Sequence, residues 1–270
     1  MTAPTEHPSP ARHPSPARRP SPTTHSGPRS YVVTGGAQGV GRAIAERLAQ
    51  DAHVVVLDVA PSLDQEHPNI SLLSGDAADP DVARRAADAA EARAPLAGWV
   101  NNAAIFRDAP ITAPPSDVLG MITANLALAV TGCHAAVGHL LRHGRPGAIV
   151  NVSSHQAQRP VRGALPYATA KGAVEALTRA VAVDHGPDGI RANAVALGSV
   201  TTARYEEYRR DHPGVDAQMA ALHPLGRVGT GAEVAEVVAF LLSDAAAFVS
   251  GAVLPVDGGR AAQGADPEAT

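Results

Sequence analysis

Tyr167 and Lys171 are the pair of residues in this chain whose types and spacing could do acid–base chemistry. Lys171 is the only lysine among the 22 strongly basic residues, so we expect a role that the planar arginine fork would not serve. In a helix, side chains four residues apart share one face. An ammonium beside a phenol favours the phenolate and lowers its pKa from about 10 towards working pH. The spacing therefore predicts a general acid/base at Tyr167, although a helix surface with an incidental tyrosine and lysine has the same pattern.

A glycine-rich stretch, Thr34 to Gly41, lies between a short apolar run, Tyr31 to Val33, and a helical pattern. Glycines let the backbone turn tightly and come close to a phosphate, while the start of a helix offers free N–H groups and a positive dipole end. We expect this turn to bind a pyrophosphate, with an ordinary tight turn as the alternative. Its spacing differs from the Gly-x-Gly-x-x-Gly dinucleotide fingerprint.

Asp58 ends the second apolar run, where an acid could accept hydrogen bonds from both hydroxyls of an adenosine ribose. A carboxylate there repels a 2′-phosphate, no basic residue follows it, and Gln38 in the glycine turn is uncharged. These residues predict NAD as the cofactor in preference to NADP. A strand-end aspartate that merely starts a turn is the other interpretation.

The composition limits the class of protein. Of the 270 residues, 45% are apolar and 3% aromatic, which suits an α/β protein with close packing of helices on a sheet. The net charge of −4 gives no support for a nucleic-acid partner. The single cysteine, Cys133, cannot form an intramolecular disulfide, which fits a reducing cytoplasm. No apolar run approaches about 20 residues and the N-terminus lacks an apolar signal core, so we expect a cytoplasmic protein without a membrane partner.

Apolar runs and helical patterns alternate over residues 30–259 without an internal linker. Continuously apolar strands separated by helices predict a parallel sheet covered on both faces, in a single domain. The polar region 201–222 is expected to form short helices in a flap. Strands are expected near residues 31–33, 53–58, 70–73, 99–100, 148–152, 191–196 and 253–256, and helices near 39–51, 79–93, 117–143, 166–185 and 232–243.

The two ends of the chain differ from this region. In residues 1–29 the stretch His7-Pro8-Ser9-Pro10-Ala11-Arg12 recurs from His13 onwards. Proline removes backbone donors, and so few apolar side chains cannot offset the ordering entropy, so we expect disorder with local polyproline II character. A solvated extension and a ligand for a proline-recognising partner both fit this composition. Residues 260–270 are expected to form a loose tail.

Together these residues resemble the short-chain dehydrogenase/reductase family over about Ser30 to Gly259. The resemblance implies an α/β fold of the Rossmann type, a doubly wound parallel sheet of about seven strands with helices on both faces. It implies a nicotinamide-dependent oxidoreductase that interconverts an alcohol and a ketone by hydride transfer, assembled as a homo-tetramer. The motifs that carry it are, in order, Thr34-Gly-x-x-x-Gly39-x-Gly41, Asn101-Asn102-Ala103, Asn125, Ser154, Tyr167-x-x-x-Lys171 and Val256-Asp257-Gly258-Gly259.

The resemblance assigns catalytic roles to four residues. Tyr167 would protonate or deprotonate the substrate oxygen, and Ser154 would orient that oxygen by a hydrogen bond. Lys171 would hold the nicotinamide ribose and lower the pKa of Tyr167, and Asn125 would hold a water that relays protons from Lys171 to solvent. The implied cofactor contacts are Gly35, Gln38, Gly39, Val40, Gly41, Asp58, Asp76, Ala77, Asn102, Ala103, Tyr167, Lys171, Gly198, Val200 and Thr202.

Two positions depart from the family pattern, since Ala104 stands where glycine is usual and Leu197 where proline is usual. Proline would stiffen the turn above the nicotinamide, so leucine is expected to loosen or reshape it. The expected substrate wall, residues 155–165 and 201–222, is unusually polar. It favours a sugar-like polyol or a carbonyl compound with an anionic group over a steroid or lipid, although the same charges could belong to a hydrated flap.

His134, His139 and His143 lie on one expected helix, but no cysteine or carboxylate cluster accompanies them in the sequence, so no metal site is expected. Two other function classes would keep the same fold. One is a dinucleotide-binding regulator without turnover, although such relatives usually lack the tyrosine or the lysine that this chain has. The other is a non-redox dehydratase or epimerase.

Overall fold

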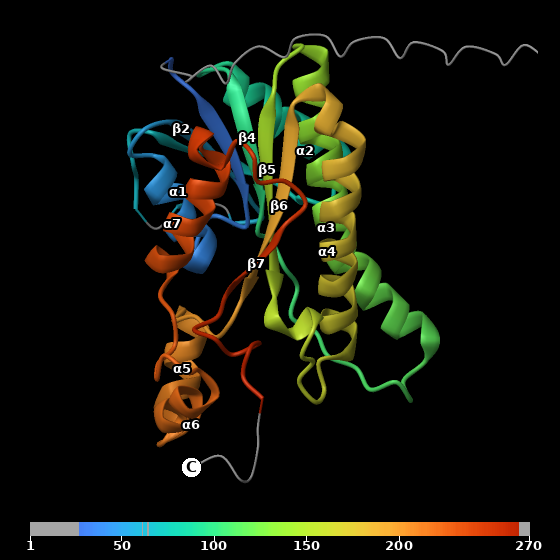
Figure 1. Ribbon diagram of the computed structural model, residues 1–270, viewed down its shortest axis with the longest axis vertical. Coiled ribbons are helices and arrows are strands. Elements are labelled where there is room, and N and C mark those ends of the chain that lie inside the picture. Colours follow the sequence, from blue (N-terminus) through green and yellow to red (C-terminus); the bar gives the residue numbers. More distant parts are fainter. Residues whose placement is uncertain (1–26, 61, 64, 265–270) are drawn as a thin grey trace, which may run out of the picture.

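The framework of this protein is a parallel β-sheet. The computed structural model describes residues 27–60, 62–63 and 65–264. Within them the chain forms one seven-stranded parallel sheet of order β3-β2-β1-β4-β5-β6-β7 (Figure 1). The order reverses between β1 and β4, the position at which open α/β sheets bind ligands beyond the carboxyl ends of their strands. The strands are β1 Ser30–Thr34, β2 His53–Asp58, β3 Ile70–Ser74, β4 Leu96–Asn101, β5 Gly147–Ser154, β6 Ile190–Leu197 and β7 Val253–Val256.

Helices cover both faces of the sheet because successive side chains of a strand point to opposite faces. Val33 and Val56 belong to the core on one face, and Val32 and Val55 belong to the core on the other. Figure 1 shows α1 and α7 on the first face and α2, α3 and α4 on the second. Their bounds are α1 Gly39–Leu48, α2 Pro80–Glu91, α3 Pro115–Arg142, α4 Leu165–His185 and α7 Gly231–Leu242.

Two short helices, α5 (Ala203–Asp211) and α6 (Val215–Leu222), lie beyond the carboxyl ends of the strands, at the lower end of Figure 1. We call residues 199–223 the flap. In α5 and α6, Val215 is the one buried residue. The flap therefore has no core of its own, and hydrogen bonds at the two ends of the flap must hold it in place. Single 3₁₀ turns, η1 His155–Ala157, η2 Gly186–Asp188 and η3 Asp244–Ala246, complete the described elements.

The predicted fold class is confirmed, and the expected strands, helices and flap are all present. The predicted C-terminal end of the first helix was wrong, because that helix was expected to reach Asp51 and ends at Leu48. There the N–H groups of Gln50 and Asp51 donate to carbonyls three residues back, which tightens the chain out of the α-helix. The prediction for the N-terminal extension falls outside the described residues up to residue 26, and that for the tail from residue 265 onwards.

α3 is long and apolar enough to meet the criterion for a membrane-spanning helix. It spans 28 residues and its most apolar window has a mean hydropathy of 1.5. A core helix of a folded domain meets the same criterion. α3 contacts β4, β5, α2 and α4, and its buried residues include Leu128, Cys133 and Leu140, so one side of the helix packs in the core on the second face of the sheet.

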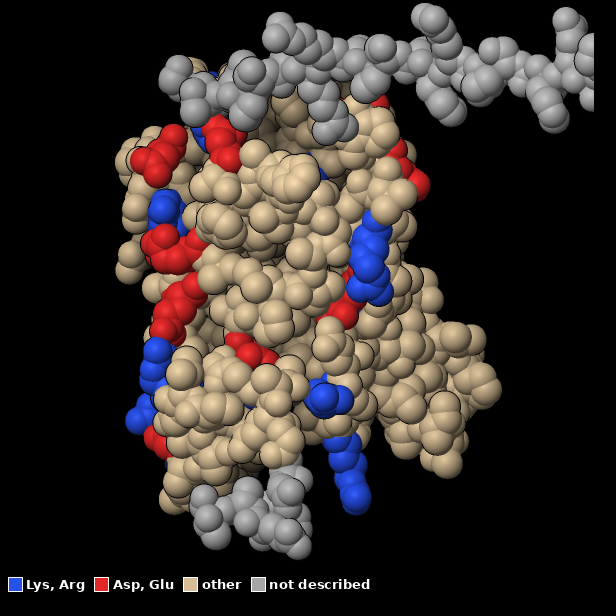
Figure 2. All heavy atoms as spheres, in the orientation of Figure 1, with Lys and Arg blue, Asp and Glu red and all other residues tan. Residues whose placement is uncertain are grey.

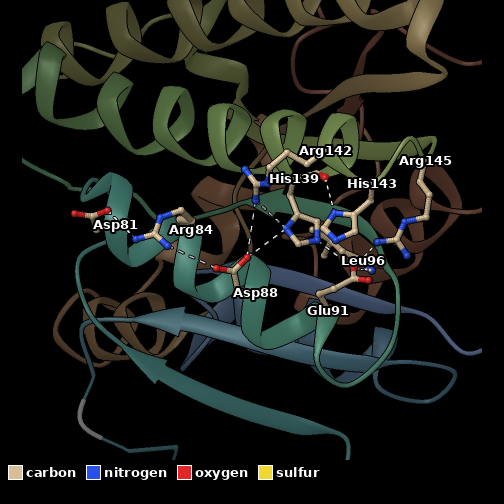
Figure 3. A network of polar contacts seen from close by, with 9 residues as sticks. All are labelled: Asp81, Arg84, Asp88, Glu91, Leu96, His139, Arg142, His143 and Arg145. Carbon is tan, nitrogen blue, oxygen red and sulfur yellow. Dashed lines mark hydrogen bonds and ion pairs between the residues drawn. The ribbon is translucent and has the colours of Figure 1, made fainter.

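An ion network joins the C-terminal turns of α2 and α3 (Figure 3). Glu91 accepts hydrogen bonds from Leu96 N (2.9 Å), from Arg145 and from the Nε2 of His139 (3.1 Å). Burial on its own would raise the pKa of Glu91, but these donors outweigh it and lower the pKa to about 2. Glu91 is therefore an anion throughout the ordinary pH range, and His139, itself only 1% exposed, is held against it.

The fold supplies the carboxylate that the sequence did not show beside the histidines. Ligand atoms of Glu91, His139 and His143 lie within 4.8 Å of one another, whereas His134 is exposed and is not part of this group. Arg142 donates to the Nδ1 of His139 (3.4 Å) and Arg145 donates to Glu91, so two guanidinium groups already face the cluster. Because a metal cation would meet these charges, we interpret the cluster as an ion network that ties α2 to α3.

Glu91→Gln should lower the free energy of unfolding by about 1–3 kcal/mol at pH 7, since it replaces a hydrogen-bonded anion by a neutral group. The folded pKa of Glu91 lies below the value of about 4.5 expected in the unfolded chain. The difference from wild type should thus be complete above pH 4.5 and vanish as the pH falls through about 2. Asp81→Asn, at an exposed ion pair on the same helix, is the matched control, with an expected effect within about 0.5 kcal/mol in denaturant unfolding. Equal effects of the two variants would contradict the assignment.

Candidate active site

The glycine turn after β1 and the turn after β4 are hydrogen-bonded to each other. Asn102 Nδ2 donates to Thr34 O (3.1 Å) and Gly35 O (2.9 Å), and Thr34 Oγ1 accepts from the N–H groups of Asn102 (3.0 Å) and Ala103 (3.1 Å). A Cβ at Gly41 would lie 2.1 Å from Gly35 O and 2.4 Å from Asn102 Nδ2. No side chain fits there, so the backbone itself lines this part of the site, as a phosphate-binding turn requires.

Asp58 faces the same turn from the end of β2. Its Oδ2 accepts from Ala37 N (2.9 Å), inside the glycine turn, and its Oδ1 accepts from Ala60 N (3.1 Å). Asp76 and Ala77 follow β3 at the same edge of the sheet, where Asp76 accepts from Ala78 N (2.8 Å). The predicted adenosine contacts therefore lie on neighbouring strand ends.

The fold also brings a cation to this edge, which sequence analysis missed. Arg42 of α1 pairs with Glu46 (2.7 Å) and donates to Gln65 O (3.0 Å) in the loop after Asp58. The prediction considered only bases directly after Asp58. Arg42 lies one turn into α1, and no local sequence pattern distinguishes it from an ordinary helix arginine.

Ser154, Tyr167 and Lys171 come together although they lie on two elements. Ser154 ends β5, and Tyr167 and Lys171 lie in the first two turns of α4. All three are at least nine-tenths buried. The side chains of Ser154 and Tyr167 are hydrogen-bonded, and Lys171 Nζ lies 5.5 Å from the centre of the Tyr167 ring. The helical spacing places the phenol and the amine close together on α4, and the end of β5 brings the Ser154 hydroxyl to the phenol.

The predicted direction of the Tyr167 pKa is wrong for the chain by itself. Burial raises the pKa of Tyr167 to about 12, and the hydrogen bond with Ser154 opposes this only in part. Lys171 Nζ donates to the carbonyl of Val152 (2.7 Å) and lies beside the ring, and burial lowers its pKa to about 8. Exclusion of water shifts the pKa of Tyr167 and that of Lys171 each in the direction that favours the neutral form. Tyr167 is therefore a proton donor at neutral pH.

The side-chain amide of Asn125 is hydrogen-bonded to the loop after β4. Its Oδ1 accepts from Ile105 N (2.8 Å) and its Nδ2 donates to Ile105 O (2.8 Å). This reciprocal pair fixes the segment after β4 that carries Phe106, whose ring centre lies 5.2 Å from that of Tyr167. The water relay assigned to Asn125 stays a prediction.

The third side of the site is the turn after β6. A Cβ at Gly198 would lie 2.7 Å from Asp257 Cα, so only glycine fits against the residue after β7. Val200 pairs with Gly229, and Thr202 caps α5 by accepting from Tyr205 N (3.2 Å). The Thr202 methyl lies 3.8 Å from where a Gly39 Cβ would be, so the flap meets the glycine turn across the site.

Arg260 was predicted to begin a loose tail, yet it donates to Ser199 Oγ (2.9 Å) in this turn. His223 was not singled out at all, and its Nε2 accepts from Ser199 N (3.2 Å). The position of Arg260 directly after Val-Asp-Gly-Gly was the available signal. Nothing in the local sequence marked His223, because its partner lies 24 residues away.

Comparison with known proteins agrees with this geometry. Residues 35–261 match the family model described as enoyl-(acyl carrier protein) reductase. A cis-4-hydroxycyclohexanecarboxylate dehydrogenase of Sinomonas cyclohexanicum is 38% identical over 249 residues, covering 87% of this chain and 97% of that protein. The aldohexose dehydrogenase of Thermoplasma acidophilum has a similar structure, with a TM-score of 0.79 and 29% identity, covering 90% and 96% of the two chains. So does ElxO with NADP bound, with a TM-score of 0.79 and 26% identity, covering 87% and 99%.

The chain belongs to the short-chain dehydrogenase/reductase family. Members of this family are oxidoreductases that bind a nicotinamide dinucleotide.

The buried amine can be observed directly, because Lys171 is the only lysine. Carbon-13 lysine labelling should give one ε-methylene NMR signal that titrates with a midpoint of about 8 in the cofactor-free protein, well below the 10.5 of an exposed lysine. The free energy of unfolding should rise between about pH 8 and 10.5, since the unfolded chain still binds that proton. A midpoint near 10.5 would show that water reaches the ammonium.

Proposed function

We propose that the protein is an NAD(H)-dependent oxidoreductase that interconverts an alcohol and a ketone on a small, polar substrate. The observation that carries the proposal is the buried group of Ser154, Tyr167 and Lys171 at the end of β5, on the same edge as the glycine turn. The nicotinamide, when bound, exchanges a hydride with the substrate carbon. The chain's own residues orient the substrate and move its proton.

In the direction of ketone reduction, Ser154 donates a hydrogen bond to the substrate oxygen and Tyr167 transfers its proton to it. The high pKa of Tyr167 keeps the phenol protonated and ready for this step. In the direction of alcohol oxidation Tyr167 must first lose that proton. Lys171, with its pKa near 8, is the cation closest to the ring and favours the phenolate when it is protonated.

The preference for NAD rests on Asp58. Its carboxylate is bound to the N–H of Ala37 in the glycine turn, so it is fixed where an adenosine ribose would lie. A 2′-phosphate would meet that negative charge. ElxO has NADP bound on a similar fold, so the fold does not select the cofactor and the charge at this position has to. Arg42 is the cation that could oppose Asp58, but it is paired with Glu46.

The polar substrate is supported by the contacts around Tyr167. The guanidinium of Arg204, on the flap, lies 5.0 Å from the centre of the Phe106 ring, which in turn packs on Tyr167. Within the described residues no ion pair engages Arg204, and a guanidinium that lies over a ring still has N–H groups to donate. A hydroxyl-rich or anionic substrate fits this wall. The names of the cyclohexanecarboxylate and aldohexose dehydrogenases are in keeping with both kinds.

We also propose a homo-tetramer. Exposed apolar side chains lie on α3 and α4, among them Leu119 and Val183, and others surround β7, among them Phe248. Figure 2 shows that the surface over β7 and its neighbours is largely uncharged, with the charged side chains towards its edges. Burial of such surfaces in an assembly would remove apolar area from water.

Tyr167→Phe should reduce turnover by about a thousandfold or more, because it removes the transferable proton, while NADH binding followed by fluorescence should change little. The assay follows NADH absorbance with a panel of polyols, sugars, hydroxy acids and steroids. Tyr208→Phe, an exposed tyrosine of the flap, should keep its activity. Near-normal rates in Tyr167→Phe would refute the catalytic role, and activity on steroids alone would refute the polar substrate.

Asp58→Ala should raise the KM for NAD and lower the KM for NADP, reducing the ratio of their kcat/KM values by about tenfold or more, since about 1.4 kcal/mol of charge repulsion corresponds to that factor. Asp51→Ala is the control, because Asp51 is an exposed aspartate at the opposite end of β2. An unchanged cofactor ratio in Asp58→Ala would overturn the preference for NAD.

A further inference from the structure

The two ends of the flap are bonded to each other. His223, directly after α6, returns to the turn after β6 and its Nε2 accepts a hydrogen bond from the backbone N–H of Ser199 (3.2 Å). The flap thus forms a loop closed at its base, although its helices bury almost nothing of their own. Whatever holds this base also holds Val200 and Thr202, which face the cofactor site.

The partners of His223 determine its protonation state. A backbone N–H can only donate, so Nε2 must carry a lone pair, and a backbone carbonyl can only accept, so Nδ1 must carry the proton that bonds Met219 O (2.6 Å). The imidazole is therefore the neutral Nδ1–H tautomer. It is only 3% exposed. A second proton on Nε2 would point at the Ser199 N–H and remove the bond.

Further contacts gather at the same base. Arg260 donates to Ser199 Oγ (2.9 Å), and Gly229 N donates to Ser199 O (2.9 Å). Earlier in the same turn, Leu197 O accepts a hydrogen bond from the Nδ1–H of His155 (3.1 Å). Leu197 lacks the rigid φ of a proline, so these side chains do the work of fixing the turn.

Three charged or titratable groups surround the base. Arg260 and Asp257 come from the segment after β7, and His155 comes from η1. Burial lowers the pKa of His155 and the Arg260 charge lowers it further, while Asp257 opposes them. The Asp257 carboxylate accepts from Gly259 N (2.9 Å) and Ala261 N (2.7 Å), so it is engaged in its own turn.

We propose that His223 is a positioning residue: its imidazole, which accepts from Ser199 N and donates to Met219 O, clasps the base of the flap and holds the Leu197–Thr201 turn in place. This rests on the proposed function in so far as the turn faces the nicotinamide.

The test compares His223→Ala, which removes the acceptor, with His223→Gln, whose amide oxygen can accept from Ser199 N. His212→Ala is the matched control, because His212 is an exposed histidine of the same flap whose Nδ1 bonds Tyr208 O. Amide hydrogen exchange of the peptide that contains Ser199 is measured at pH 7.5, and the KM for NADH and kcat are measured at the same pH.

At pH 7.5, His223→Ala should lose at least tenfold of the protection at Ser199 and raise the KM for NADH by a similar factor with a smaller change in kcat. His223→Gln and His212→Ala should match wild type.

Full protection at Ser199 in His223→Ala, or equal loss in His212→Ala, would each overturn the clasp. Hydrogen exchange needs no turnover, so the two proposals can fail separately. Absence of any alcohol or ketone activity together with the expected exchange pattern would refute the function and leave the clasp, and normal turnover without that pattern would do the reverse.

Discussion

The close approach of two backbone turns at the reversal of strand order is the constraint on which the rest of this structure depends. The carboxyl ends of β1 and β4 are joined through Thr34, Gly35 and Asn102, and the space between them is too small for a single Cβ at Gly41. A parallel sheet brings all strand ends of one kind to one edge. Asp58, the Ser154 group and the flap can surround this junction only because it is built from backbone.

Exclusion of water decides the chemistry of the acid–base group. A neighbouring ammonium would stabilise a phenolate, but Lys171 and Tyr167 are both buried and the ammonium is bonded to a carbonyl. Desolvation therefore favours the uncharged form of each, with pKa values of about 8 and about 12. The phenol therefore keeps its proton at neutral pH in the protein by itself.

The flap is held by hydrogen bonds rather than by burial of apolar side chains. Its two helices contribute little to either core, so its position depends on a few directional bonds, from His223 and Arg260 to Ser199 and from Gly229 across to Val200 and Thr201. Segments held in this way open at low energetic cost compared with the core. The sheet thus supplies rigid strand ends, and a lightly held segment lies beyond them.

The sequence by itself determined the local features. Continuous apolar runs predicted the buried strands, the Tyr167–Lys171 spacing predicted two side chains on one helical face, and Asp58 was placed at a strand end, because each of these depends on residues close together in the chain. Only the tertiary structure decided that Glu91 meets His139, that His223 clasps Ser199, that Arg260 is part of the site, and that burial raises rather than lowers the pKa of Tyr167. These outcomes depend on which side chains of distant elements face one another and on how much water they exclude, and neither quantity is encoded in local spacing.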